Sequence, residues 1–166
     1  MNEVFRVSRY EAPLDAKCLI EVDDYVPLRF RTYERPLGAS YLRVGDRTKS
    51  LVELLIDPNQ GLLRGITVTC FSALSSWPHM ETREVALGLP VLAVPWGKAN
   101  RIDSGVDFSV SVHGSDILVS WAALDRCDAS CFQDRVRFLA VDGQLAGAHF
   151  SGLEPDQIKA FLRHAP

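Results

Sequence analysis

Two segments of this chain follow the same plan, and both predict an antiparallel β-hairpin. Residues 50–71 (SLVELLIDPNQGLLRGITVTCF) and 134–153 (DRVRFLAVDGQLAGAHFSGL) each contain an apolar strand, a turn with aspartate and glycine, and a return strand. Asp142-Gly143 is a strong two-residue hairpin signal, because both central positions of the preferred turn have positive φ. Gly61 can close the longer loop of the first hairpin in the same way. Such hairpins build a scaffold, and no comparable pattern in the sequence builds a catalytic centre.

Further strands are predicted where polar and apolar residues alternate, in segments 4–9, 17–22, 28–33 and 107–112. In the third of these, Arg29 and Arg31 lie on one face, and Leu28 and Phe30 lie on the other. Such alternation indicates a strand with one face on a core and one in water. Gly114 then provides a tight turn into a strand at 116–121.

The segment 72–100 is the least regular part of the chain, and we expect a packed loop there. It contains three prolines and two tryptophans (Pro78, Pro90, Pro95, Trp77 and Trp96). A strand within 84–94 would lie at a sheet edge, because Pro90 has no N–H to donate to a ladder.

The chain ends in a predicted helix with Pro155 in its first turn and one apolar stripe, formed by Leu153, Ile158, Phe161 and Leu162. The sequence therefore predicts an α+β fold that is predominantly antiparallel β. We expect a sandwich or a strongly curved sheet with the C-terminal helix packed on it. Residues 1–166 are expected to form a single domain.

The composition excludes some classes of binding partner and indicates the cellular compartment. A net charge of −3 and a pI near 5.8 argue against a general nucleic-acid binder and against a polybasic membrane-surface protein. The N-terminal residues alternate without an apolar core, and no run approaches the roughly 18 apolar residues of a membrane span. Without a secretory context, the four cysteines are expected to be reduced thiols in the cytoplasm.

Candidate chemical sites are few. Cys127 and Cys131 would face the same way on a helix, but zinc sites normally add a second such pair, which the sequence lacks. We expect both cysteines to be semi-buried in a short helix or loop, with no metal and no cofactor. His79 stands near Ser75, Ser76 and Glu81, without the strained elbow or oxyanion donors that a nucleophilic serine needs. Phosphate-binding glycine motifs are also absent, so we expect no enzymatic activity.

The segment from Arg101 onward has the strongest functional signal, which is electrostatic. Between positions 101 and 134 stand two arginines and six aspartates: Asp103, Asp107, Asp116, Asp125, Asp128 and Asp134. Such a surface can steer a cationic partner and set its register. The alternative is that aspartate is here as the favoured turn residue. Trp96 is either an exposed interface anchor or a core residue, whereas Trp121 is expected in the core.

The layout resembles bacterial immunity proteins that neutralise polymorphic toxins, particularly those of contact-dependent growth inhibition. The resemblance rests on SLVELLIDPNQGLLRGITV, IDSGVDFSVSV and RVRFLAVDGQLAGAHFSGLEPDQI, about half of the chain. It implies a cytoplasmic inhibitor that binds the C-terminal domain of a cognate toxin, for which a basic nuclease would suit an acidic surface. It implies no direct contact with nucleic acid or membrane.

Two other functions remain open. The apolar strands and the tryptophans are also compatible with a β-rich domain that encloses a small apolar ligand. An enzyme would need a buried histidine beside a carboxylate at a cleft.

Overall fold

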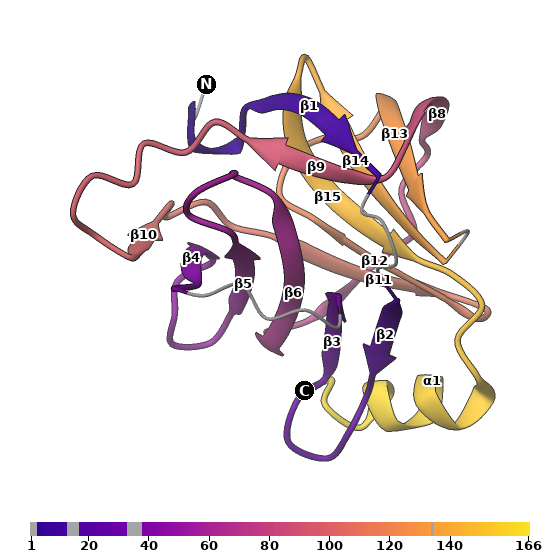
Figure 1. Ribbon diagram of the computed structural model, residues 1–166. Helices are drawn as coiled ribbons and strands as arrows, with labels where there is room; N and C mark the ends of the chain where they lie inside the picture. Colours follow the sequence, from indigo (N-terminus) through magenta and orange to yellow (C-terminus); the bar gives the residue numbers. More distant parts are fainter. Residues whose placement is uncertain (1–2, 13–16, 33–37, 134) are drawn as a thin grey trace.

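The computed structural model describes residues 3–12, 17–32, 38–133 and 135–166 (Figure 1). Two large β-sheets face each other around one apolar core, and a single α-helix follows the last strand. The α+β sandwich, predominantly β with a C-terminal helix, is confirmed. A 3₁₀ turn, η1 (Glu3–Phe5), precedes the first strand.

The six-stranded sheet contains the first predicted hairpin. Its strand order is β10 (Arg101–Asp103), β4 (Ser40–Val44), β5 (Leu51–Ile56), β6 (Leu63–Cys70), β3 (Leu28–Thr32) and β2 (Cys18–Glu21). All neighbours are antiparallel except β10 and β4. The hairpin is β5–β6, with Val52, Leu54 and Ile56 fully buried on one face. Gly61 closes its loop at φ 72°, as expected.

The seven-stranded sheet contains the second hairpin. Its order is β7 (Leu74–Ser75), β11 (Ser109–His113), β12 (Asp116–Ser120), β15 (Gln144–Phe150), β14 (Val136–Val141), β13 (Arg126–Phe132) and β8 (Glu81–Leu87). The two edge strands, β7 and β8, run parallel to their neighbours. Asp142 and Gly143 turn β14 into β15 with φ values of 51° and 74°, which confirms the predicted tight turn.

Both faces of the seven-stranded sheet are covered. The inner face packs on the six-stranded sheet, where Phe30 lies within 5.7 Å of Phe138 between ring centroids. On the outer face, a second apolar cluster comprises Leu118, Leu124, Cys127, Ala129, Leu139 and Ala146. Trp77 and Met80, from the segment that joins edge strands β7 and β8, pack against this cluster.

The segment 72–100 is more regular than its prolines and tryptophans predicted. It holds β7, β8 and β9 (Leu89–Leu92), and β9 pairs with β1 (Val7–Glu11) in a small separate sheet. The single strand expected within 84–94 is two strands, separated at Gly88. At this residue φ is 121°, and a Cβ atom would lie 2.5 Å from the Glu11 carbonyl oxygen. Pro90 is tolerated because both strands of a two-stranded sheet are edges.

Two further expectations were wrong. Cys127 and Cys131 lie on strand β13, not in a short helix or loop, because pairing with both β8 and β14 extends this segment. On a strand their Cα atoms stand about 13 Å apart, too far to share one site. Leu162, the last residue of the C-terminal helix, is 40% exposed rather than part of the packed stripe.

Helix α1 (Pro155–Leu162) closes one end of the sandwich, beside β2 and β3 (Figure 1). Phe161 is fully buried and stacks on Phe71 at 5.2 Å. Gln157 donates a hydrogen bond to the Ile20 carbonyl, and Arg163 pairs with Asp24. Within the described ranges, no helix has the length and apolar character needed to cross a membrane.

Candidate functional site

The predicted acidic residues occupy several separate places. Asp103, Asp116 and Asp128 are each paired with a basic side chain, whereas Asp107 and Asp125 are exposed and bond to no described side chain. Asp134 lies outside the described residues. Asp103 and Asp128 therefore have their charge offset by arginines, and Asp116 shares a hydrogen bond with His149.

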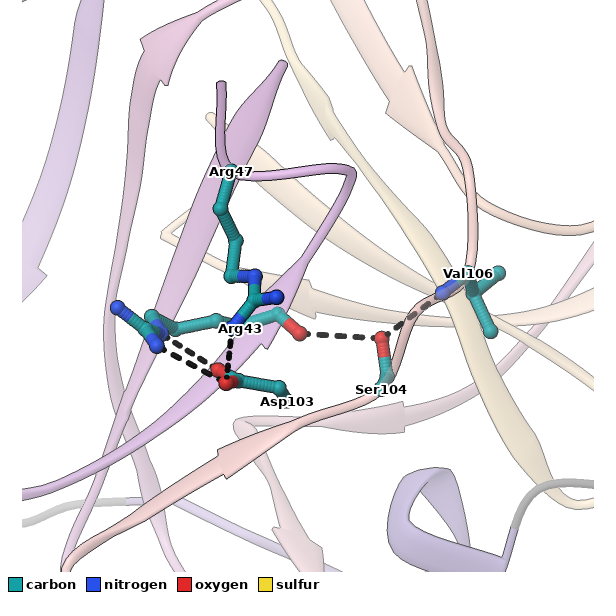
Figure 2. Close-up of polar contacts among 5 residues, drawn as sticks. All are labelled: Arg43, Arg47, Asp103, Ser104 and Val106. Atoms are coloured by element: carbon teal, nitrogen blue, oxygen red, sulfur yellow. Dashed lines mark hydrogen bonds and ion pairs between the residues drawn. The ribbon is translucent and has the colours of Figure 1, made fainter. Parts of the chain in front are cut away.

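Asp103 lies between two arginines at the edge of the six-stranded sheet (Figure 2). Arg43 donates from Nε to Oδ1 at 2.6 Å and from a terminal nitrogen to Oδ2 at 3.0 Å, and Arg47 donates to Oδ2 at 2.7 Å. The hydrogen bonds and charge of the arginines hold the pKa of Asp103 below its ordinary value. Ser104 extends the link by donating to the Arg43 carbonyl oxygen.

The turn after β4 explains why Arg47 reaches this position. The Asp46 carboxylate accepts hydrogen bonds from the backbone N–H groups of Thr48, Lys49 and Ser50. Within this turn Arg47 takes a φ of 68°, which is uncommon for a residue with a side chain. The turn thus directs a second guanidinium onto Asp103.

Asp116 belongs to a different environment, on the outer face of the seven-stranded sheet. Its Oδ2 lies 2.9 Å from Nε2 of the buried His149, and its Oδ1 accepts the Gly152 N–H. Burial raises the pKa of Asp116, but the bonds from His149 and Gly152 outweigh this effect, so the pKa is lowered. The Trp77 ring meets the His149 ring edge-on at 5.4 Å between centroids. The enzyme alternative would need a buried histidine beside a carboxylate at a cleft; the histidine and the carboxylate are together here, with the Trp77 ring packed against His149.

The topology separates these aspartates. Asp116 on β12 and Asp128 on β13 are three strand spacings apart, about 14 Å, and the register places them at opposite ends of the sheet. Asp103 belongs to the other sheet. The expectation that one face gathers the aspartates is therefore wrong, because β12 and β13 follow one another in sequence but are separated by β15 and β14 in the sheet. A contact role for the individual residues stays a prediction.

Trp121 and Trp96 differ in their burial. Trp121 is 7% exposed and stacks on Phe5, which confirms its place in the core. Its Nε1 donates to the Leu145 carbonyl oxygen at 2.6 Å. Trp96 is half-buried and packs against the main core, and its buried Nε1 has no hydrogen-bond partner among the described residues.

The outer face of the six-stranded sheet carries a denser set of charged side chains. Its outward residues alternate with the buried inner ones, and its charged members are Glu21, Arg29, Arg31, Arg43, Glu53, Arg101 and Asp103. We call this surface, with Arg47 beside it, the arginine face. It has five arginines and three carboxylates, so its sign is opposite to the acidic surface that was expected.

The arginine face is ordered in rows across the strands. One row runs Arg31, Gly65, Leu55, Tyr41 and Arg101, with each residue opposite the next. The neighbouring row runs Glu21, Arg29, Thr67, Glu53, Arg43 and Asp103. Glu21 pairs with Arg29 at 3.8 Å and with Arg31 at 3.5 Å.

A groove of about 530 Å³ lies in this face, over Gly65 near the start of β6. Arg29, Arg31, Tyr41, Glu53 and Leu55 line it. Sequence reasoning had noted that Arg29 and Arg31 alternate with Leu28 and Phe30, and that pattern was the available signal. It could not show that Tyr41, Glu53 and Arg101 join them on this face, because four strand pairings between β3 and β10 decide this.

Other sites are less developed. In the parts of the chain that the structure describes, no three histidine, cysteine or acidic side chains are placed to hold a metal ion. His79 forms no hydrogen bond with Ser75 or Ser76 there. A smaller apolar pocket of about 290 Å³ is separate from this groove and is lined by Phe5, Val106, Trp121, Val141 and Leu145.

Comparison with known proteins does not assign the chain to a family. No protein-family model matches the chain, and no curated protein sequence matches it. The resemblance to immunity proteins therefore stays a prediction.

Proposed function

We propose that this protein is an immunity protein, which binds and neutralises a cognate toxin domain in the cytoplasm by contact alone. The arginine face is the observation that carries the proposal. It places several arginines and the 36% exposed Tyr41 around a groove, on a sheet whose other face forms the core. Arginine and tyrosine are enriched at protein interfaces. The resemblance of three segments to immunity proteins supplies the class of partner.

The positive charge of the arginine face bears on which charge the surface of the partner should carry. Of the predicted contact aspartates that the structure describes, only Asp107 and Asp125 are exposed without an ion pair, so these residues offer a basic toxin domain few unpaired charges. The arginine face instead suits a partner surface that presents carboxylates.

Co-expression with the toxin domain encoded by the neighbouring gene tests the proposal. We expect the two proteins to co-purify and the toxic effect on growth to disappear. Arg101→Glu should weaken this protection and Arg126→Glu should not. Both arginines are exposed, begin a strand and form no ion pair with a described residue, but only Arg101 lies on the arginine face. Failure of the wild-type chain to bind or protect against that domain would contradict the proposal.

The apolar pocket supports a second candidate, the binding of a small apolar ligand. Its volume of about 290 Å³ is at the lower end of the range for ligand sites, and aromatic side chains form part of its wall. Native mass spectrometry of the purified protein tests this function. A retained small molecule that Val106→Trp displaces is the expected result, and a bare polypeptide mass contradicts it.

A further inference from the structure

Gly65 lies beneath the groove in the arginine face, and its backbone φ does not require glycine. It lies inside β6, and its φ is outside the left-handed region. A Cβ atom there would lie 3.0 Å from the Phe30 carbonyl oxygen, which is a tight contact, and its next neighbours would be Leu55 side-chain atoms at 3.5 and 3.6 Å. Gly147 in β15 differs, since its Cβ would lie 2.5 Å from the Val119 carbonyl oxygen. A glycine in a strand interior often marks a site where another group approaches the sheet closely.

The side chains beside Gly65 form an apolar centre between cations. Leu55 and Tyr41 follow Gly65 along the row, and Arg31 and Arg101 stand at its two ends. These arginines are four strand spacings apart, about 19 Å. An extended peptide covers that distance with about six residues, at 3.3–3.6 Å per residue.

The charges favour a polypeptide over a nucleic acid. Glu21, Glu53 and Asp103 form part of the row beside the one that ends in Arg31 and Arg101. A phosphate backbone is charged at every nucleotide and would face these carboxylates, whereas a peptide with carboxylates only near its two ends would not. Glu53 forms no ion pair or hydrogen bond with a described residue, although it lies close enough to Arg43 to raise the pKa of that arginine. Arg101 forms no ion pair within the described part of the chain. Arg101 is thus available to an occupant, whereas Arg31 would share its charge between Glu21 and the occupant.

We propose that the groove over Gly65 takes up an extended acidic segment of the partner, with one aromatic or large apolar side chain on Leu55 and Tyr41 and carboxylates on Arg31 and Arg101. This inference rests on the proposed function for the identity of the partner, but the groove can be probed without it. Occupation of the groove would place the anchor side chain at the centre of the contact, where binding energy concentrates.

The test uses a synthetic peptide of about six residues with a central phenylalanine and an aspartate near each end. A twin peptide with lysine in place of aspartate is the control. We expect the acidic peptide to shift the ¹H–¹⁵N signals of Gly65, Leu55 and Tyr41 in the full chain, and the lysine twin to leave them in place. Absence of these shifts, shifts elsewhere, or equal shifts with both peptides would overturn the inference.

Variants make the test specific. Arg31→Glu should weaken binding of the acidic peptide by about tenfold, corresponding to about 1.4 kcal/mol, and Arg126→Glu should leave it unchanged. Gly65→Val should block the groove, and Tyr41→Ala provides a second variant at an exposed position if the valine disturbs the sheet. Unchanged affinity in Arg31→Glu and Tyr41→Ala contradicts the inference. Peptide binding in the groove without protection against the toxin would contradict the proposed function alone.

Discussion

Arg43 on β4 binds Asp103 on β10 through two parallel hydrogen bonds, although the two residues are 60 positions apart in sequence. The pairing attaches a three-residue strand to the edge of the six-stranded sheet. Arg47 adds a third bond to the same carboxylate. The most acidic segment of the chain thus contributes its first aspartate to a structural link.

Removal of this carboxylate should cost stability. In Asp103→Asn the two guanidinium groups lose their charged acceptor, and we expect a loss of about 0.5–1 kcal/mol because the pair is partly exposed to solvent. This corresponds to a Tm lower by a few degrees, about 1–4 °C. Thermal unfolding followed by circular dichroism measures it. Asp125→Asn is the control, and an equal effect of both substitutions would refute a specific role for Asp103.

Asp116 should make the free energy of unfolding depend on pH in the acidic range. Its pKa is lowered in the folded protein, so the folded state is favoured above the ordinary pKa of about 3.9, and this contribution is lost as the pH falls through the folded pKa. In Asp116→Asn the stability should fall less between pH 5 and pH 2, values chosen to bracket about 3.9. Urea unfolding across this range measures it, with Asp107→Asn as the control. Identical pH profiles for Asp116→Asn and the wild type would exclude the contribution.

A comparison of Trp121 and Trp96 can show how much one buried hydrogen bond contributes to the free energy of unfolding. Trp121→Phe removes the donor to the Leu145 carbonyl, whereas Trp96→Phe removes an N–H that has no partner among the described residues. We expect the loss in unfolding free energy to be larger in Trp121→Phe by at least about 1 kcal/mol. Urea unfolding of both variants decides this, and a larger loss in Trp96→Phe would contradict it.

Gly147 and Gly65 should respond differently to alanine. The Cβ at position 147 would clash with the β12 backbone at 2.5 Å, whereas at position 65 the closest atom is at 3.0 Å. We expect Gly147→Ala to lose about 1–3 kcal/mol, as overpacking does, and Gly65→Ala to lose less. The denaturant midpoints of the two variants test which substitution costs more stability. A greater loss in Gly65→Ala would contradict the prediction.

The four cysteines should react slowly with thiol reagents in the folded protein. All are free, and burial raises the pKa of each thiol, that of Cys18 to about 11. The thiolate is the reactive form. An Ellman assay at neutral pH should therefore give slow labelling of the native chain and four equivalents after unfolding. Rapid labelling of the native chain would contradict this burial.

Local patterns were sufficient for part of the fold. The Asp142-Gly143 turn, the β5–β6 hairpin and the α1 helix follow from turn sterics and from apolar periodicity, which act within a few residues. Strands β8 and β10 were not predicted as they stand. Their residues are largely exposed, and they are strands because β13 and β4 supply their hydrogen-bond partners from distant parts of the chain.

The sequence by itself determined that the protein is rich in antiparallel hairpins, ends in a helix, and places arginines and apolar side chains on opposite faces of β3. Only the tertiary structure decided which charges share a surface. Side-chain charge is encoded residue by residue, but neighbourhood across a sheet depends on strand order, so Asp103 lies beside Arg43 while Asp116 and Asp128 stand apart. The same strand order brings Gly65 between Arg31 and Leu55 and thereby creates the groove.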